Sequence, residues 1–202
     1  MNEDLGNQAL VEAAKGGSVE AFSELMLQYE KRIYNFLLQW VRSSHDAEDL
    51  TQETFLKAFR NIRRLDSARV FSSWLFTIAR RTASNHFRAL KPKEELPDDT
   101  QCGEENPAEA LERKEEGDSV WRLARRLKPA QFEVLWLRYG EGFSVQETAH
   151  IMNTNQIRVK VLLHRGRKEL AQSLQRHRPD LSPVIKEVIL PGSEKNRTML
   201  VL

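Results

Sequence analysis

Apolar residues recur along the first third of the chain with the three- to four-residue spacing of amphipathic helices. The first stripe is formed by Phe22, Leu25, Met26, Tyr29, Ile33, Phe36, Leu37 and Trp40. Such spacing places the stripe on one face of a helix, and Ser18 is suited to cap the start of that helix. The stripe therefore predicts a core helix rather than a cofactor site.

Two further helices are predicted over 46–63 and 72–90, with a loop at 65–71 between them. One face of the first is formed by Ala47, Leu50, Thr51, Thr54, Phe55, Ala58 and Ile62. Its opposite face is polar, and the acidic residues at its start favour the helix dipole. The predicted apolar side of the second is formed by Trp74, Leu75, Ile78, Ala79 and Thr82.

The helical pattern stops after residue 90. Residues 91–118 contain helix-breaking Pro and Gly together with four Lys/Arg and eleven Asp/Glu, a net charge of −7. Low hydrophobicity and high charge are typical of a flexible linker. The predicted fold is thus all-α, with two small helical domains, 1–90 and 119–177, joined by an acidic flexible linker at 91–118. A C-terminal tail, 178–202, has no predicted role.

The second lobe has the pattern of a helix-turn-helix. Pro129 suits the first position of a helix, and Ser144 with Glu147 forms a capping-box pattern that opens a short helix. A turn through Asn153 and Thr154 precedes a long helix over 155–175. A short helix, a turn of three to four residues and a second helix are typical of proteins that dock in the major groove.

Charge supports that interpretation, because the net charge of +2 over 202 residues is unevenly distributed. Residues 157–178 contain seven Lys/Arg and one Glu. The predicted inward face of the long helix is formed by Val159, Leu163, Gly166 and Leu170, and most of its cations lie off that face. Such cations suit DNA phosphates and guanine edges, whereas the alternative is an ordinary solvated helix face.

Two surfaces of the first lobe also have candidate chemistry. The helix over 72–90 combines Arg80, Arg81 and Arg88 with aromatic residues, which suits a single nucleic-acid strand; alternatively, Trp74 at helical spacing belongs to the core. Asp46, Asp49 and Glu53 could hold a cation, act in catalysis or meet a basic protein surface. No nucleophile or further ligand accompanies them, so a solvated face is the default.

Four motifs resemble the extracytoplasmic-function (ECF) subfamily of the sigma-70 family of RNA polymerase sigma factors. Residues 46–59, Asp-Ala-Glu-Asp-Leu-Thr-Gln-Glu-Thr-Phe-Leu-Lys-Ala-Phe, are similar to region 2.2, and residues 73–80 to the Trp-Leu-aromatic-x-Ile-Ala-Arg stretch. Residues 127–129 with 135–139 resemble the start of region 4, and 159–160 with 164–170 its recognition helix. The resemblance covers 20–90 and 119–174.

This resemblance implies a factor that binds core RNA polymerase, through the β′ clamp helices and the β subunit, and directs promoter-specific initiation. The implied polymerase-binding residues are Asp46, Asp49, Gln52, Glu53 and Leu56. Those implied to bind melted −10 DNA are Arg69, Phe71, Trp74, Arg80, Arg81, Ser84, Asn85 and Arg88. Those implied to read −35 duplex are Asn155, Gln156, Arg158, Lys160, Val161, His164, Arg165 and Arg167. An anti-sigma factor is an implied partner.

The chain departs from the family pattern in its recognition helix. Val161 and Leu162 stand where the family usually has groups that face DNA. An exposed apolar pair there could touch thymine methyl groups or pack on another protein.

Other classes receive little support. Cys102 is the only cysteine, the five His lack metal-ligand spacing, and we expect no cofactor and no catalytic residue. We expect no signal peptide and no membrane insertion, and therefore a cytoplasmic protein. The alternatives are a stand-alone helix-turn-helix regulator, which would usually dimerise, and a helical enzyme or interaction protein without a DNA role.

Overall fold

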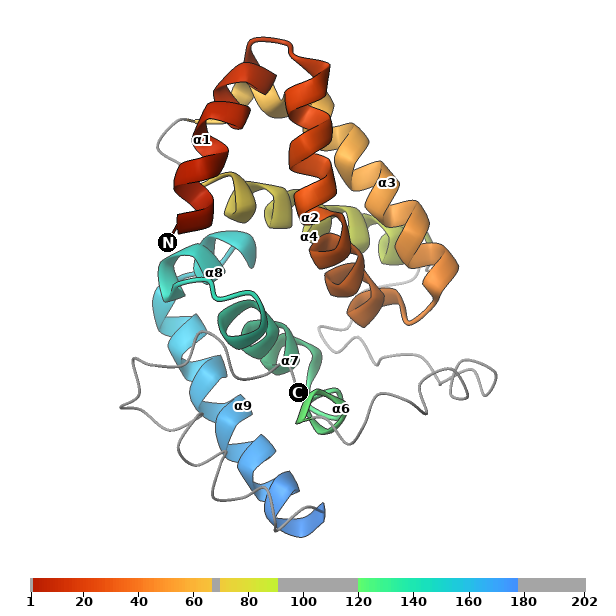
Figure 1. Ribbon diagram of the computed structural model, residues 1–202. Coiled ribbons are helices and arrows are strands. Elements are labelled where there is room, and N and C mark those ends of the chain that lie inside the picture. Colours follow the sequence, from red (N-terminus) through yellow and green to blue (C-terminus); the bar gives the residue numbers. More distant parts are fainter. Residues whose placement is uncertain (1, 67–69, 91–119, 178–202) are drawn as a thin grey trace. The chain divides into compact units, whose positions relative to one another are not determined.

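The computed structural model describes residues 2–66, 70–90 and 120–177, and every regular element in those ranges is a helix (Figure 1). The all-α prediction is therefore confirmed for the described part of the chain. The chain divides into two compact units, Met1–Leu96 and Pro97–Leu202. The segments at 91–118 and 178–202 for which we predicted a linker and a tail lie outside the described residues.

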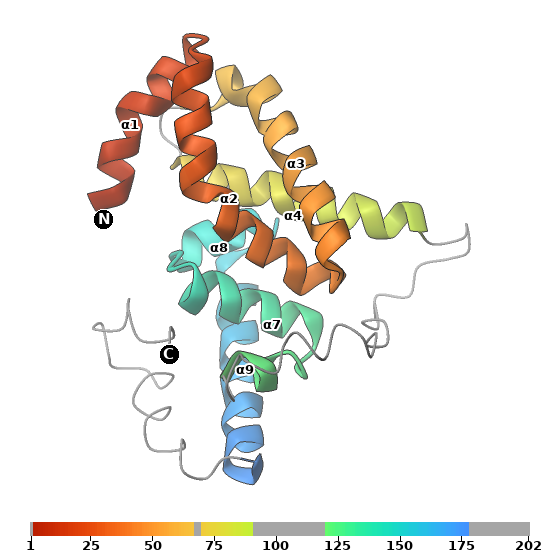
Figure 2. The same ribbon diagram turned by 45° about the vertical axis from the view of Figure 1, so that its right-hand side comes forward.

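The first unit contains the three helices predicted from the apolar pattern and one that was not. Its elements are α1 (Asn2–Lys15), α2 (Val19–Val41), α3 (Ser44–Asn61), the 3₁₀ turn η1 (Ile62–Arg64) and α4 (Phe71–Leu90). Helix α2 contacts α1, α3 and α4, and α3 also packs on α4 (Figures 1 and 2). The apolar pattern missed α1 because its buried side is short. There, Val11 and Ala14 are buried, and Asn7 Nδ2 donates to Tyr29 Oη at 3.1 Å.

The long stripe of α2 forms the centre of the first core. Leu25, Ile33 and Leu37 are completely buried, whereas Met26 and Trp40 at its edges are half-buried. The predicted cap is confirmed, because Ser18 Oγ accepts a hydrogen bond from the Ala21 amide at 3.1 Å. Hydrogen bonds from its own backbone amide and from the Ser18 hydroxyl lower the pKa of Glu20.

Helix α4 is buried over a wider arc than the pattern predicted: Leu75, Ala79 and Thr82 of the predicted side are buried, and the buried arc extends beyond them. Trp74 and Ile78 are only half-buried, while Phe71 and Phe76 are core residues. Their rings lie 5.3 Å from Tyr29 and 5.2 Å from Phe36, respectively, between ring centres. The reason is that α4 packs against both α2 and α3, which buries a wider arc than a single apolar stripe and leaves Trp74 at its edge.

The second unit contains α6 (Val120–Ala124), α7 (Pro129–Leu135), the π-helical turn η3 (Trp136–Gly140), α8 (Val145–Ile151) and α9 (Gln156–His177). Pro129 opens α7 as predicted. The capping box of α8 is also confirmed: Ser144 Oγ accepts from the Glu147 amide at 3.1 Å, and Glu147 Oε2 accepts from the Ser144 amide at 2.8 Å.

Helix α9 packs against α6, α7 and α8 through its predicted inward face. Val159, Leu163 and Leu170 are buried there. At Gly166 the backbone of α9 lies close to α7, because an added Cβ would be 3.2 Å from Leu135 Cδ1 and 3.4 Å from the backbone oxygen of Gln131. This packing fixes which side of α9 remains exposed.

Thr148 in α8 is predicted to lower the stability of the second unit. Its hydroxyl is completely buried and, among the described residues, has no hydrogen-bond partner. Burying an unpaired hydroxyl costs about 1–3 kcal/mol, so we expect Thr148→Val to raise the free energy of unfolding by about 1 kcal/mol in urea titrations. The matched control is Thr54→Val, because the Thr54 hydroxyl donates to the Leu50 carbonyl at 2.7 Å. A gain of stability in both variants would refute the explanation.

Candidate nucleic-acid and polymerase interfaces

The outer face of α3 presents carboxylates beside an exposed leucine. Ser43 caps this helix, because its Oγ accepts from the Asp46 amide at 3.2 Å, and Asp46 itself is half-buried. One and two turns further on, Asp49, Gln52 and Glu53 are exposed, and Leu56 is 56% exposed. These side chains lie on one surface of the helix, which we call the α3 face: Asp46, Asp49, Gln52, Glu53 and Leu56.

Phe59 extends this surface, and sequence reasoning missed it. It is 44% exposed, and its ring packs edge-on against Phe22 at 5.0 Å between ring centres. The signal for it was its position three residues after Leu56, since residues at that spacing are neighbours on a helix surface. Exposed apolar side chains beside a row of carboxylates suit a protein partner that is both apolar and basic.

Within the described residues, the contacts of the α3-face carboxylates with basic side chains are local. Glu53 pairs with Lys57 at 2.6 Å, and Asp49 lies 3.8 Å from the His45 imidazole. Exposed pairs of this kind contribute little to stability. The face can therefore exchange these contacts for those of a partner without disturbing the helix.

A groove of about 490 Å³ lies between α3 and α4. Three of the residues predicted to bind −10 DNA line this α3–α4 groove: Trp74, Arg81 and Asn85. The rest of its lining is Lys57, Asn61, Arg64, Ile78 and Thr82. Sequence reasoning missed Asn61 and Arg64 because they reach the groove from the end of α3 and from η1, respectively, and not from α4.

The lining combines cations with one broad aromatic surface. Lys57 Nζ donates to Thr82 Oγ1 at 3.2 Å, which ties the two walls together. Arg64 and Arg81 are exposed, and Trp74 is half-buried in the wall. Cations for phosphates and an aromatic surface for a base are the features that bind single-stranded nucleic acid.

Two of the predicted −10 residues point elsewhere. Phe71 is only 5% exposed, and its ring packs on Tyr29 and Trp74. The prediction that Phe71 contacts DNA is therefore corrected, because the first turn of α4 belongs to the core. Arg80 is half-buried with its guanidinium 5.8 Å from the centre of the Trp40 ring, on the side of α2.

The remaining predicted −10 residues of α4 lie toward its C-terminal end. Ser84 is half-buried and Arg88 is exposed. Arg69 lies outside the described residues.

In the second unit, α8 and α9 form a helix-turn-helix with a tight, well-bonded turn. Asn153 adopts the left-handed conformation (φ 51°), and the Thr154 amide donates to the Ala149 carbonyl at 2.9 Å. Asn155, predicted to contact DNA, caps α9, because its Oδ1 accepts from the Arg158 amide at 2.8 Å. Its side-chain oxygen is thus already used within the protein.

The outer face of α9 carries most of the predicted −35 residues. The exposed ones are Asn155, Gln156, Arg158, Lys160, Val161, His164 and Arg165. Arg167 departs from the prediction: it is half-buried, and its guanidinium donates to the Leu163 carbonyl at 3.2 Å and to Tyr139 Oη at 3.5 Å. Packing against η3 therefore draws Arg167 away from the outer face.

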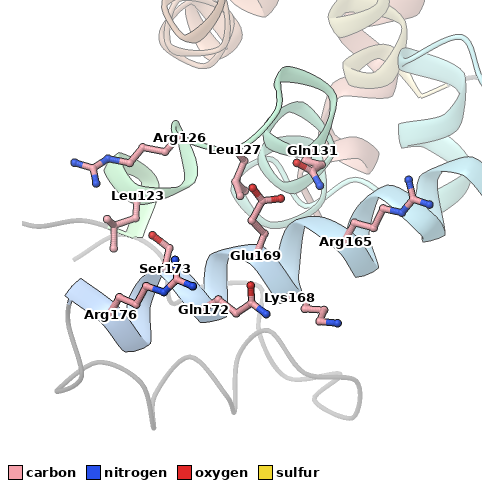
Figure 3. A pocket seen from close by; sticks show the side chains of 10 residues that line it. All are labelled: Leu123, Arg126, Leu127, Gln131, Arg165, Lys168, Glu169, Gln172, Ser173 and Arg176. Atoms are coloured by element: carbon pink, nitrogen blue, oxygen red, sulfur yellow. The ribbon is translucent and has the colours of Figure 1, made fainter. Parts of the chain in front are cut away.

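A second groove, of about 510 Å³, follows the C-terminal half of α9 beside α6 and α7 (Figure 3). Leu123 and Leu127 line it, and one carboxylate, Glu169, faces it. Its cations are Arg126, Arg165, Lys168 and Arg176, and none has an ion-pair partner within the described ranges. Arg165 thus belongs both to this groove and to the exposed outer face of α9.

Comparison with known proteins connects these surfaces. Residues 25–92 match the family model for sigma-70 region 2, and residues 117–170 match that for sigma-70 region 4. The ECF RNA polymerase sigma factor SigM of Bacillus subtilis is 32% identical to the chain over 152 residues, which is 73% of this chain and 91% of SigM. The chain belongs to the ECF sigma factors.

Further relatives agree with this assignment. The ECF sigma factor BldN of Streptomyces coelicolor is 37% identical over 174 residues, which cover 82% of this sigma factor and 64% of BldN. The fold is shared with the sigma factor RpoE of Bartonella quintana, solved with the anti-sigma factor NepR. That structure has a TM-score of 0.59 and 21% identity, and the match covers 79% of this chain and all of RpoE.

Family membership decides between the classes considered from sequence. Sigma factors are DNA-binding transcription initiation factors, so the chain is not a stand-alone regulator. Within the residues that the structure describes, no three His, Cys, Asp or Glu side chains are grouped to hold a metal ion. None of the helices in those residues has the length and apolar character needed to cross a membrane.

Proposed function

We propose that this sigma factor docks on core RNA polymerase through the α3 face, holds melted −10 DNA in the α3–α4 groove and reads −35 duplex with the outer face of α9. The observation that carries the proposal is that three chemically distinct surfaces coincide with the three roles. One is acidic and apolar, one combines cations with Trp74, and one is a cationic recognition helix. The factor contributes binding and no catalytic chemistry.

Promoter opening in this proposal is a capture reaction. Unstacking a base costs a few kcal/mol, and stacking on an aromatic ring returns about 1–3 kcal/mol per base. Trp74 supplies the ring, while Arg64 and Arg81 neutralise the phosphates on either side. Melted DNA is therefore stabilised without nucleotide hydrolysis by this factor.

The experiment that tests the proposal is transcription in vitro, with the full-length protein added to sigma-free core polymerase on a library of promoter-like templates. We expect initiation from a subset of templates that share −35 and −10 elements. Binding to core polymerase without selective initiation would contradict the promoter roles. No binding to core would contradict the docking role.

Arg165 provides a more specific prediction for the −35 element. If its exposed guanidinium reads a base edge, Arg165→Ala should weaken binding to −35 duplex by about 1–3 kcal/mol and relax selectivity at one position. The control is Arg176→Ala, which removes the same charge at the other end of the groove (Figure 3). Equal losses in both variants, uniform over sequences, would make Arg165 a phosphate contact only.

We also propose that an anti-sigma factor holds this protein inactive in the cytoplasm. Support comes from RpoE, which shares the fold and is bound by NepR. Exposed cations along α9 and exposed apolar side chains on the α3 face are surfaces that such a partner can cover. Crosslinking in cells with a photoreactive residue at Phe59 tests this: a bound protein that blocks core binding is expected, and polymerase as the sole adduct would contradict it.

A further inference from the structure

The outer face of α9 has an apolar pair at its centre. Ile157 is 75% exposed and Val161 is 41% exposed, one helical turn apart. Leu162, by contrast, is half-buried. The exposed apolar pair in this helix is therefore Ile157 with Val161, and not Val161 with Leu162 as the sequence alone suggested.

The position of the pair follows from the burial of the opposite side. Val159, Leu163 and Gly166 pack inward, so at about 3.6 residues per turn Ile157 and Val161 point directly away from the unit. The exposed cations of this half of the helix lie on both flanks: Arg158 and Arg165 on one, Lys160 on the other.

This arrangement matches a helix inserted in the major groove. The central line of such a helix reaches the base edges, while flanking cations meet phosphates on the two strands. A protein interface of standard size has a broad apolar core inside a polar rim, whereas the centre here consists of two aliphatic side chains flanked by cations. No carboxylate stands among the flanking residues from 155 to 168.

We propose that Ile157 and Val161 are specificity-determining residues that read thymine C5-methyl groups in the −35 element. The thymine methyl is the apolar group that base edges display in the major groove, and two branched aliphatic side chains can make no hydrogen bond there. This inference rests on the proposed −35 role of α9. It predicts that the preferred −35 sequence contains T·A pairs at the one or two steps nearest this pair.

The test uses full-length protein bound to core polymerase. A −35 duplex is first selected from a randomised library, and each thymine is then replaced singly by deoxyuridine, which removes only the methyl group. We expect wild-type binding to weaken about fourfold at one or two positions, as for loss of one buried methyl. Val161→Ala should bind the thymine duplex about fourfold more weakly and should not distinguish thymine from uracil there.

Gln172→Ala serves as the matched control, because Gln172 is exposed on the same side of α9 but in its C-terminal half. It should keep the wild-type response to deoxyuridine. Equal binding of thymine and uracil duplexes by the wild type, with sequence selectivity intact, would overturn the inference and leave the proposed function standing. Absence of any selective duplex binding would overturn both. Weaker core binding by Ile157→Ala with unchanged DNA binding would assign the pair to a protein contact and overturn the inference.

Discussion

Replacing Asp49 and Glu53 together with arginine is expected to weaken binding to core RNA polymerase by at least ~100-fold, because each change substitutes like-charge repulsion for attraction at a basic partner surface. Both carboxylates lie on the exposed side of α3, with side chains 64% and 50% exposed. The measurement is the affinity of the full-length protein for sigma-free core polymerase at fixed ionic strength.

The fold should survive this double change. The contacts that are lost are the exposed one between Asp49 and His45 and the partly exposed ion pair between Glu53 and Lys57, and surface pairs are each worth about 0–1 kcal/mol. Lys57 also keeps its hydrogen bond to Thr82. We therefore expect an unchanged helical circular dichroism spectrum and a melting temperature within a few degrees of the wild type.

A charge-matched control separates docking from net charge. Glu24→Arg with Glu30→Arg makes the same change in total charge at exposed positions of α2. This variant should bind core polymerase almost as the wild type does. If the α3 and α2 variants lose affinity equally, the effect is general electrostatics; if neither does, the α3 face is not the docking site.

Much of the fold could be predicted because the signals that specify it are local. The stripe of α2 repeats over several turns, and Ser18 and Ser144 lie within three residues of the amides they cap. Such patterns depend only on helix geometry and on side chains adjacent in sequence. They are preserved whatever the helices later pack against.

Predictions failed where packing between helices determines which of two chemically similar residues is buried. Phe71 and Trp74 are both aromatic and three residues apart, yet packing of α4 against α2 buries the first and leaves the second in a groove. The same is true of Leu162 and Ile157, since the side of α9 that packs inward determines which of them is exposed. The α3–α4 groove likewise could not be found from one helix, because Arg64 and Arg81 come from different elements.

Reversing the charge of both Arg64 and Arg81 should abolish promoter opening while the factor stays bound to the polymerase. Arg64→Glu with Arg81→Glu places two carboxylates where the proposed groove meets phosphates, and we expect open-complex formation to fall by at least ~100-fold. Core binding and −35 duplex binding should remain within about twofold of wild type, because neither the α3 face nor α9 is changed. Potassium permanganate footprinting of the −10 element measures the opening.

A control variant and a pre-melted template distinguish this prediction from a general effect of charge. Lys31→Glu with Arg63→Glu is the charge-matched control: both side chains are exposed, neither belongs to α3, and neither lines the groove. In addition, a pre-melted −10 bubble should not restore the groove variant, since the step that is lost is capture of the strand rather than strand separation. Its binding to a single-stranded −10 oligonucleotide should show a salt slope lower by about 0.7 for each phosphate contact removed. Full rescue by the bubble would mean that these arginines act on duplex DNA before melting, and the α3–α4 groove would then be an entry surface and not the site that holds the melted strand.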